Sequence, residues 1–313
     1  MRFLLLSAAL AAQVLAQGKR GFNYGANGPS GPRAQQDFEA EFNRAKTLPG
    51  TAPFTSARLF TMIQANTAND PSSAIPAAIA TNTSLLLGLW ASAGQDAFNQ
   101  ELEALRRALE QFGQPFIDLI DGISVGSEDL YRITPTGIAN KAGIGASPDD
   151  LVKYIQQTRD KLNGHDNLKS KIGHVDTWTA WVNETNYPVT TACDWIGMDS
   201  YPYYQKEVPN SIDQAKELFF QSYNTTKNVS QGKKVLVTET GWPVAGPDFG
   251  LAKANVDNAK RFWDEVGCAL FAEPVDTWWF TLDDSKQNPE EISFSVVKPG
   301  LGDPIWDLKC PGQ

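Results

Sequence analysis

The sequence predicts a single α/β domain, a (β/α)8 or TIM barrel, and three observations support this fold class. Short apolar runs alternate with longer segments of helical period, as in a parallel sheet with helical crossovers. Eight such runs occur, and eight parallel strands close a barrel. The 313 residues contain no Pro/Ser-rich linker or charge block that would divide them. The alternative is an open doubly wound sheet, but Gly25, Gly28 and Gly31 lack the GxGxxG spacing of its phosphate loop.

The eight predicted strands are spread over most of the chain. They are GFNYG from Gly21, SARLFTM from Ser56, SLLLGLW from Ser84, GISVGSE from Gly122, KIGHVDTW from Lys171, DWIGMDSYPYY from Asp194, KVLVTETGW from Lys234 and DTWWFTL from Asp276. Helical period or helix-forming composition predicts helices at residues 35–46, 96–112, 148–162, 212–223 and 255–270. Residues 179–193, between the fifth and sixth strands, are expected to hold at most a short helix.

The first 16 residues have the pattern of a secretory signal peptide, and residues 17–313 form the predicted barrel. Met1 and Arg2 precede an apolar run, which ends at Ala16 before a polar segment. A short buried helix is the alternative, because the run is too short to span a bilayer. We therefore expect a secreted protein, extracellular or associated with a cell wall, without a membrane span. The C-terminus carries no apolar tail, so we also expect no lipid anchor on this chain.

Two further features agree with secretion. Glycosylation sequons occur at Asn82, Asn183, Asn224 and Asn228, although we do not expect all four to be used. The three cysteines leave one unpaired in an oxidising compartment. A Cys268–Cys310 disulfide would hold the C-terminus against a late helix, whereas Cys193 opens a buried strand, where a thiol acts as a small hydrophobe.

Composition and charge exclude several classes of partner. The chain is 42% hydrophobic and 20% charged, which is ordinary for a globular protein. Its net charge of -9 disfavours nucleic acid and anionic membranes, but imposes no penalty on a neutral polymer. Neither paired Cys/His spacing nor a compact acidic loop is present, so no metal or other cofactor is expected. We expect a monomer.

Two glutamates carry the predicted chemistry. Glu128 and Glu239 end the fourth and seventh predicted strands, and the carboxyl ends of barrel strands form the active-site face. These two strands lie across the barrel mouth from each other, so their terminal side chains can meet over its centre. A pair of carboxylates about 5 Å apart can act as proton donor and nucleophile in glycosidic bond cleavage with retention. Alternatively, each glutamate caps a helix or pairs with an arginine.

The segments VGSEDLYR, HVDTW, DSYPYY, TETGWP and NAKRFWDEVG resemble those of glycoside hydrolase family 17, in particular its fungal secreted or cell-wall glucan endo-1,3-β-glucosidases. The resemblance covers nearly all of residues 17–313. It implies a (β/α)8 barrel, Glu128 as acid/base, Glu239 as nucleophile and β-1,3-glucan as substrate. The chain departs from the commonest family pattern at Ser127, where an asparagine usually precedes the acid/base, so contact with the sugar 2-hydroxyl is expected to be weaker or water-bridged.

A cleft for neutral sugars needs aromatic platforms beside polar groups. The candidate substrate-binding residues are Tyr24, Phe60, Trp178, Asp199, Tyr201, Trp242 and Asp284, with Asp176 as a further carboxylate at a strand end. Tyr201 is also the candidate donor that keeps Glu239 ionised, while a drier environment is expected to raise the pKa of Glu128. Some of these aromatics are expected to be core residues instead. His174 is expected to be a hydrogen-bonded structural residue rather than a base.

Three functions follow from these observations. The first is a secreted retaining hydrolase of internal β-1,3 bonds in glucan, acting in fungal cell-wall turnover. The second is a β-1,3-glucan transglycosylase, which would pass the same covalent intermediate to another sugar. The third is a noncatalytic glucan-binding wall protein, which would have no need of a paired acid and nucleophile.

Overall fold

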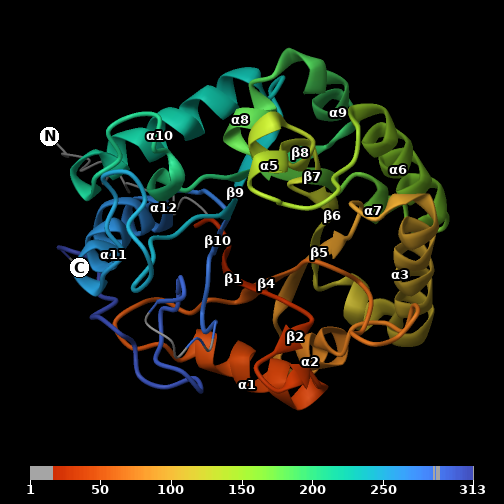
Figure 1. Ribbon diagram of the computed structural model, residues 1–313. Coiled ribbons are helices and arrows are strands. Elements are labelled where there is room, and N and C mark those ends of the chain that lie inside the picture. The colour runs from red at the N-terminus through yellow and green to blue at the C-terminus, as the bar shows by residue number, and fades with distance from the viewer. Residues whose placement is uncertain (1–16, 285, 287–289, 313) are drawn as a thin grey trace, which may run out of the picture.

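Eight parallel strands form a closed barrel with helices around it, so the predicted fold class is confirmed (Figure 1). The computed structural model describes residues 17–284, 286 and 290–312. The predicted signal peptide, residues 1–16, lies outside these described residues. Strand neighbours follow the chain around the barrel, and the last strand pairs with the first to close it.

Each predicted strand segment overlaps one strand of the barrel. The strands are β1 Arg20–Tyr24, β4 Ser56–Leu59, β5 Ser84–Leu89, β6 Ile120–Ser127, β7 Ile172–Thr177, β8 Trp195–Asp199, β9 Lys234–Glu239 and β10 Thr277–Trp279. Nearly all of their residues are buried, because the barrel interior covers one face and the helices cover the other. A separate two-residue pair, β2 Asn27–Gly28 and β3 Gly31–Pro32, forms a small antiparallel sheet.

The α-helices alternate with the strands along much of the chain, and the longer ones surround the barrel in chain order (Figure 1). They are α1 Gln35–Lys46, α2 Ala74–Thr81, α3 Gly94–Ile117, α4 Asp129–Arg132, α5 Pro135–Ala139, α6 Pro148–Lys161, α7 Asp166–Lys169, α8 Trp178–Trp181, α9 Tyr187–Ala192, α10 Ile212–Val229, α11 Val256–Phe262 and α12 Cys268–Ala272. A π-helical turn, Trp263–Gly267, joins α11 to α12. Short 3-10 turns lie at Glu184–Asn186 and Pro202–Tyr204.

The five predicted helices are confirmed, with differences at their ends. The segment after the fifth strand is more helical than expected, because α8, a 3-10 turn and α9 follow one another there. In α3 the expected end at residue 112 marks a real break: Gly113 has φ 56° and ψ -145°, outside the helical region. The chain then turns helical again as far as Ile117.

Two tryptophans fill much of the barrel interior. Trp195 and Trp278 belong to a cluster of buried side chains, completed by Leu86, Val175 and Leu236. The interior is so full that a Cβ at Gly173 would lie 2.4 Å from the Trp195 ring. The interior is therefore a packed core without space for a substrate, and an active site has to lie at the mouth of the barrel.

The structure also bears on the cysteines, the sequons and membrane insertion. The predicted Cys268–Cys310 disulfide is present, and Cys193 is free and buried, as expected. The four sequon asparagines are exposed, and their glycosylation stays a prediction. Within residues 17–284, 286 and 290–312, no helix has the length and apolar character needed to cross a bilayer.

Candidate active site

Glu128 and Glu239 lie at the carboxyl ends of β6 and β9, two strands of the same barrel that are separated by β7 and β8. Glu239 is the last residue of β9, and Glu128 directly follows Ser127 at the end of β6. Arg58 of β4 joins the two strand ends, because its guanidinium contacts both Glu239 and Ser127. Burial is the main cause of the raised pKa of Glu128, and the negative charge of Glu239 is the second. The two carboxyls therefore share one electrostatic environment.

Both oxygens of the Glu239 carboxylate accept a hydrogen bond. The Arg58 guanidinium donates to Oε1 at 2.5 Å, and the Tyr201 hydroxyl donates to Oε2 at 2.8 Å. A guanidinium and a hydroxyl both favour the ionised form of a carboxyl group. Tyr201 thus lies where a donor to Glu239 was expected, and Arg58 is a second donor that the sequence analysis did not identify.

Arg58 is the centre of a buried polar network. Besides Glu239, it donates to Asn23 Oδ1 at 2.7 Å and to Ser127 Oγ at 2.9 Å. Its side chain is only 1% exposed, so its charge needs these partners. The signal in the sequence was a charged residue inside the apolar strand run SARLFTM. Ser127 occupies the position where the family commonly has asparagine, and here its hydroxyl accepts from Arg58.

Glu128 has a different environment from Glu239. Burial, together with the negative charges of Glu239 and Asp176, raises the pKa of Glu128 to about 8, although the positive charges of Arg132 and Arg58 oppose this rise. The nearest cation, the Arg132 guanidinium, lies 3.9 Å from Glu128 Oε2, and a quarter of the Glu128 side chain remains exposed. A protonated carboxyl that reaches solvent can donate its proton to a bound molecule.

The turn that carries Glu128 is unusual in its backbone. Glu128 has φ 57° and Gly126 has φ 84°, both in the left-handed region that favours glycine. A Cβ at Gly126 would lie 2.1 Å from Asp129 Oδ2, and that oxygen accepts the N–H of Ser127 at 2.7 Å. The N–H of Glu128 donates to Val175 O at 2.9 Å. The conformation is held from several sides, as at many functional sites.

Aromatic side chains with partly exposed rings lie near these carboxyls. The expected candidates among them are Phe60 and Tyr201, and Trp178 is also partly exposed, at the start of α8. Three more were not identified from the sequence, namely Trp90, Tyr131 and Tyr204. Arg58 stacks on the Phe60 ring and Arg132 on the Trp90 ring, each at 4.8 Å from the centroid. These contacts link the rings to the charged residues beside the glutamates.

Four expected binding residues are corrected by their surroundings. Tyr24 and Trp242 are 4% and 2% exposed, which leaves neither ring a face for a sugar. Asp199 is 1% exposed and accepts from Thr238 Oγ1 at 2.6 Å, so it lies beneath the site. Asp284 instead holds its own loop, because its oxygens accept from Ser293, Phe294 and Ser295. Burial and loop closure depend on packing that strand-end position does not reveal.

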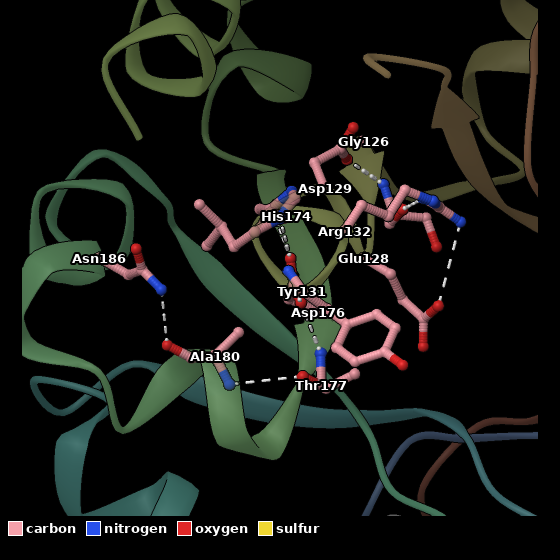
Figure 2. Close-up of polar contacts among 12 residues, drawn as sticks. Gly126, Glu128, Asp129, Tyr131, Arg132, His174, Asp176, Thr177, Ala180 and Asn186 are labelled. Atoms are coloured by element: carbon pink, nitrogen blue, oxygen red, sulfur yellow. Dashed lines mark hydrogen bonds and ion pairs between the residues drawn. The ribbon is translucent and has the colours of Figure 1, made fainter. Parts of the chain in front are cut away.

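Asp176 and His174 are also fully buried. Both are 0% exposed. Asp176 was expected to bind a sugar hydroxyl, but its buried carboxylate cannot reach one. His174 contacts Asp176 Oδ2 (Figure 2) and Val125 O, which agrees with the structural role expected for it. In the described part of the chain, no group of three or more His, Cys, Asp or Glu side chains is arranged to hold a metal ion.

Comparison with known proteins gives a consistent result. Residues 21–296 match the BtgE/BtgC glycoside hydrolase domain. The chain is 52% identical to a probable glucan endo-1,3-beta-glucosidase of Aspergillus oryzae, over 98% of this chain and 66% of the relative. Its identity to the protein of the same name in Aspergillus fumigatus is 51%, over 98% and 68%. The chain thus spans about two thirds of the length of these relatives.

A solved structure supports the same relationship. The glycoside hydrolase family 17 beta-1,3-glucanosyltransferase from Rhizomucor miehei superposes with a TM-score of 0.74 at 25% identity, covering 92% of this chain and 96% of that one. An active-site mutant of that enzyme was solved in complex with laminaritriose, and it matches at 26% identity with the same TM-score of 0.74.

Proposed function

This chain belongs to the BtgE/BtgC glycoside hydrolase family, and from that premise we propose that it hydrolyses internal β-1,3-glucosidic bonds of glucan with retention. The resemblance to glycoside hydrolase family 17 is confirmed by the family match and the relatives in Aspergillus together with the family 17 structure from Rhizomucor miehei. The substrate and the endo mode of action are inferred from the names of those relatives. The roles of the individual residues are inferred from the geometry of the site.

One observation carries the proposal. Two carboxyl groups at the same barrel mouth have environments that favour opposite protonation states. Burial and nearby negative charge keep the proton on Glu128, whereas Arg58 and Tyr201 favour the carboxylate of Glu239. Retaining cleavage needs this combination of one acid and one nucleophile.

The reaction proceeds in two displacements. Glu239 attacks the anomeric carbon while Glu128 donates its proton to the departing glycosidic oxygen, so the carbon–oxygen bond to the leaving chain breaks and a glycosyl–Glu239 ester forms. Glu128, now ionised, then removes a proton from water as the water attacks the same carbon. This second step releases Glu239 and restores the proton on Glu128.

Replacement of Glu239 tests the nucleophile assignment. In Glu239→Gln the side chain keeps its size but cannot form the ester, so we expect laminarin hydrolysis to fall by roughly 10⁴-fold while glucan is still bound. Reducing-end release and binding to insoluble β-1,3-glucan measure the two properties separately. Undiminished hydrolysis by this variant would refute the assignment, whatever the binding assay shows.

Transfer to a second sugar is the other candidate function. The solved relative from Rhizomucor miehei is a beta-1,3-glucanosyltransferase, and its fold covers nearly all of this chain. Hydrolysis and transfer share the glycosyl–Glu239 ester and differ only in whether water or a sugar hydroxyl gives its proton to Glu128. Incubation with one purified laminari-oligosaccharide decides between them: shorter products alone support hydrolysis, and products longer than the substrate support transfer.

We propose further that the protein is a secreted, monomeric glycoprotein that works outside the cell or in the fungal wall. The disulfide and the exposed sequon asparagines support secretion. Expression in a fungal host should give a protein in the medium whose first residue is Gln17. Light scattering should give the mass of one chain. A protein that stays inside the cell with residues 1–16 still attached would contradict the proposal.

A further inference from the structure

His174 and Asp176 form a buried pair directly behind the turn that carries Glu128. Both belong to β7, where residues two apart share one face of the strand. Val175, between them, belongs to the cluster in the barrel interior, so the pair faces outward toward the helices. The His174 ring also lies against Trp181 of α8, with 5.6 Å between ring centroids. Water does not reach either side chain, since both are 0% exposed.

The hydrogen-bond partners of His174 favour a proton on both ring nitrogens. Nδ1 lies 2.6 Å from Val125 O, and a carbonyl oxygen can only accept, so Nδ1 carries a proton. Nε2 lies 3.0 Å from Asp176 Oδ2. That carboxyl group already accepts three backbone N–H groups, from Leu130 at 2.8 Å, Tyr131 at 3.2 Å and Thr177 at 2.8 Å. Three such donors favour the ionised carboxylate, which leaves the shared proton on Nε2.

These contacts hold the chain on both sides of Glu128, and Figure 2 shows the side that Asp176 holds. His174 fixes the carbonyl of Val125, three residues before Glu128, and Asp176 fixes the N–H groups of the two residues that follow Asp129. The N-terminus of α4 is thereby anchored to β7. The left-handed backbone of Glu128 is maintained by contacts of this kind, because it is costly for any residue other than glycine.

We propose that His174 is a permanently charged imidazolium and that, together with Asp176, it positions the acid/base Glu128. The pair is a positioning device and does not touch the substrate. This proposal rests on the proposed function, because it assigns a role in the reaction that Glu128 performs.

The charges around His174 support this proposal. Burial alone lowers the pKa of His174, but the hydrogen bond and charge of Asp176 and the charge of Asp129 outweigh burial and raise it above its usual value. Asp176 in turn is one of the negative charges that act on Glu128, and Arg132 opposes them. Another titratable neighbour is the Cys193 thiol, which contacts the backbone of His174 and whose pKa burial raises to about 12. At neutral pH it therefore adds no charge.

The protonation state can be measured directly by ¹⁵N NMR of the histidine rings. The chain has only two histidines, and His165→Gln shows which signals belong to His174. We expect both ring nitrogens of His174 to carry protons throughout pH 6–8, where an ordinary histidine becomes neutral. In Asp176→Asn, which keeps the shape but removes the charge, the ring should be neutral at pH 7. A neutral ring in the unmodified protein at pH 7 would overturn the proposal.

Kinetics test the positioning role. In His174→Gln we expect kcat on laminarin to fall by roughly 10- to 100-fold with KM within about twofold, since a small displacement of Glu128 has such effects. The alkaline limb of the pH profile should move to higher pH. Without the positive charge of His174, the negative charge of Asp176 acts more strongly on Glu128 and raises its pKa further. His165→Gln should change neither quantity. Unchanged kcat and alkaline limb in folded His174→Gln would refute the role. The NMR result stands apart from activity, so failure of the proposed function would be recognised separately.

Discussion

At the scale of single residues, the central feature is the unequal treatment of two identical side chains. Glu239 receives a guanidinium and a phenol hydroxyl, each within hydrogen-bond distance of one carboxylate oxygen. Among the described residues, Glu128 has no such close donor, and the nearest cation, Arg132, is 3.9 Å away. The difference arises from the partners that the fold brings to each strand end. In the mechanism that we propose, the same residue type therefore acts as nucleophile in one place and as acid in the other.

The pH dependence of activity follows from the protonated state of Glu128. Burial and the charges of Glu239 and Asp176 raise its pKa to about 8, and the acid works only while it holds its proton. We therefore expect kcat/KM for laminarin to remain high through neutral pH and to fall as pH rises through this value. A decline that begins near pH 4, the usual range of a glutamate, would contradict the assignment.

Removal of the acid should depend on the leaving group. In Glu128→Gln we expect a roughly 10²- to 10⁴-fold loss on laminarin, because a sugar leaving group needs the proton. An aryl β-glucoside with an acidic phenol needs no such help, so its first step should be nearly unimpaired in a stopped-flow burst. Glu110→Gln, at a side chain 65% exposed on α3, is the control and should behave as the unmodified enzyme. Equal losses on both substrates would argue against an acid role.

Sequence patterns located the two glutamates but not most of their surroundings. A carboxylate at the end of an apolar strand is visible in the sequence, and both segments occur as expected. Arg58 could be suspected only as a charge inside an apolar strand. Trp242 shows the opposite error: it follows the Glu239 strand closely, yet its ring packs on Tyr203 and Phe262 and its Nε1 donates to Lys253 O. Which aromatics reach the cleft depends on three-dimensional packing.

At the scale of elements, the turn between β6 and α4 links the barrel to the chemistry. The pairing of β6 with β7 is irregular between Ser124 and Ser127, just before Glu128. The irregular strand end, the left-handed Gly126 and the short helix α4 together direct the glutamate toward the mouth. Strand and helix positions were predictable, because apolar runs and helical period mark them. The irregular pairing was not, because it has no periodic signal.

Gly126→Ala tests the turn as a unit. The new Cβ would lie 2.1 Å from Asp129 Oδ2 in a residue with φ 84°, so Asp129 must move and release the N–H of Ser127. We expect a loss of stability of more than about 2 kcal/mol and at least a tenfold loss of kcat/KM. Urea unfolding and laminarin kinetics measure the two effects.

The matched control is Gly164→Ala. Gly164 has nearly the same backbone, φ 89°, but nothing lies within 4 Å of its Cβ position. We expect a loss of about 1–2 kcal/mol from the left-handed conformation alone, with full activity. If both variants lose equal stability and Gly126→Ala keeps its activity, the contact with Asp129 is unimportant.

At the scale of the whole molecule, the closed barrel brings together residues that are far apart in the chain. Arg58 and Glu239 are separated by 181 positions, yet they share a hydrogen bond because β4 and β9 belong to one closed sheet. The fold class was predictable from the count and alternation of elements. The side-chain contacts at the mouth were not predictable. They form only when the barrel closes, and the sequence of one strand does not indicate which residues of another strand it will contact.

The disulfide acts on the whole molecule by holding its C-terminus. It closes a loop with a sequence separation of 42 residues, for which loop entropy predicts about 4 kcal/mol of stability. A Cys268→Ser/Cys310→Ser double variant should therefore unfold at lower temperature but keep its kcat at 25 °C, since the disulfide joins α12 to the C-terminal segment and the glutamates lie at the ends of β6 and β9. Reductant should lower the unfolding temperature of the unmodified protein and leave that of the variant unchanged. A reductant effect on the variant would contradict this account.

The most direct test of the central claim is to trap the glycosyl–enzyme ester. A 2-fluoro laminari-oligosaccharyl fluoride forms this ester but hydrolyses it slowly, and mass spectrometry of tryptic peptides then locates the sugar. We predict that it lies on residues 235–253, where Glu239 and Asp248 are the only carboxylate side chains, and that fragmentation assigns it to Glu239. Sugar attached to another residue, or no covalent adduct while an active enzyme is inhibited, would contradict the account.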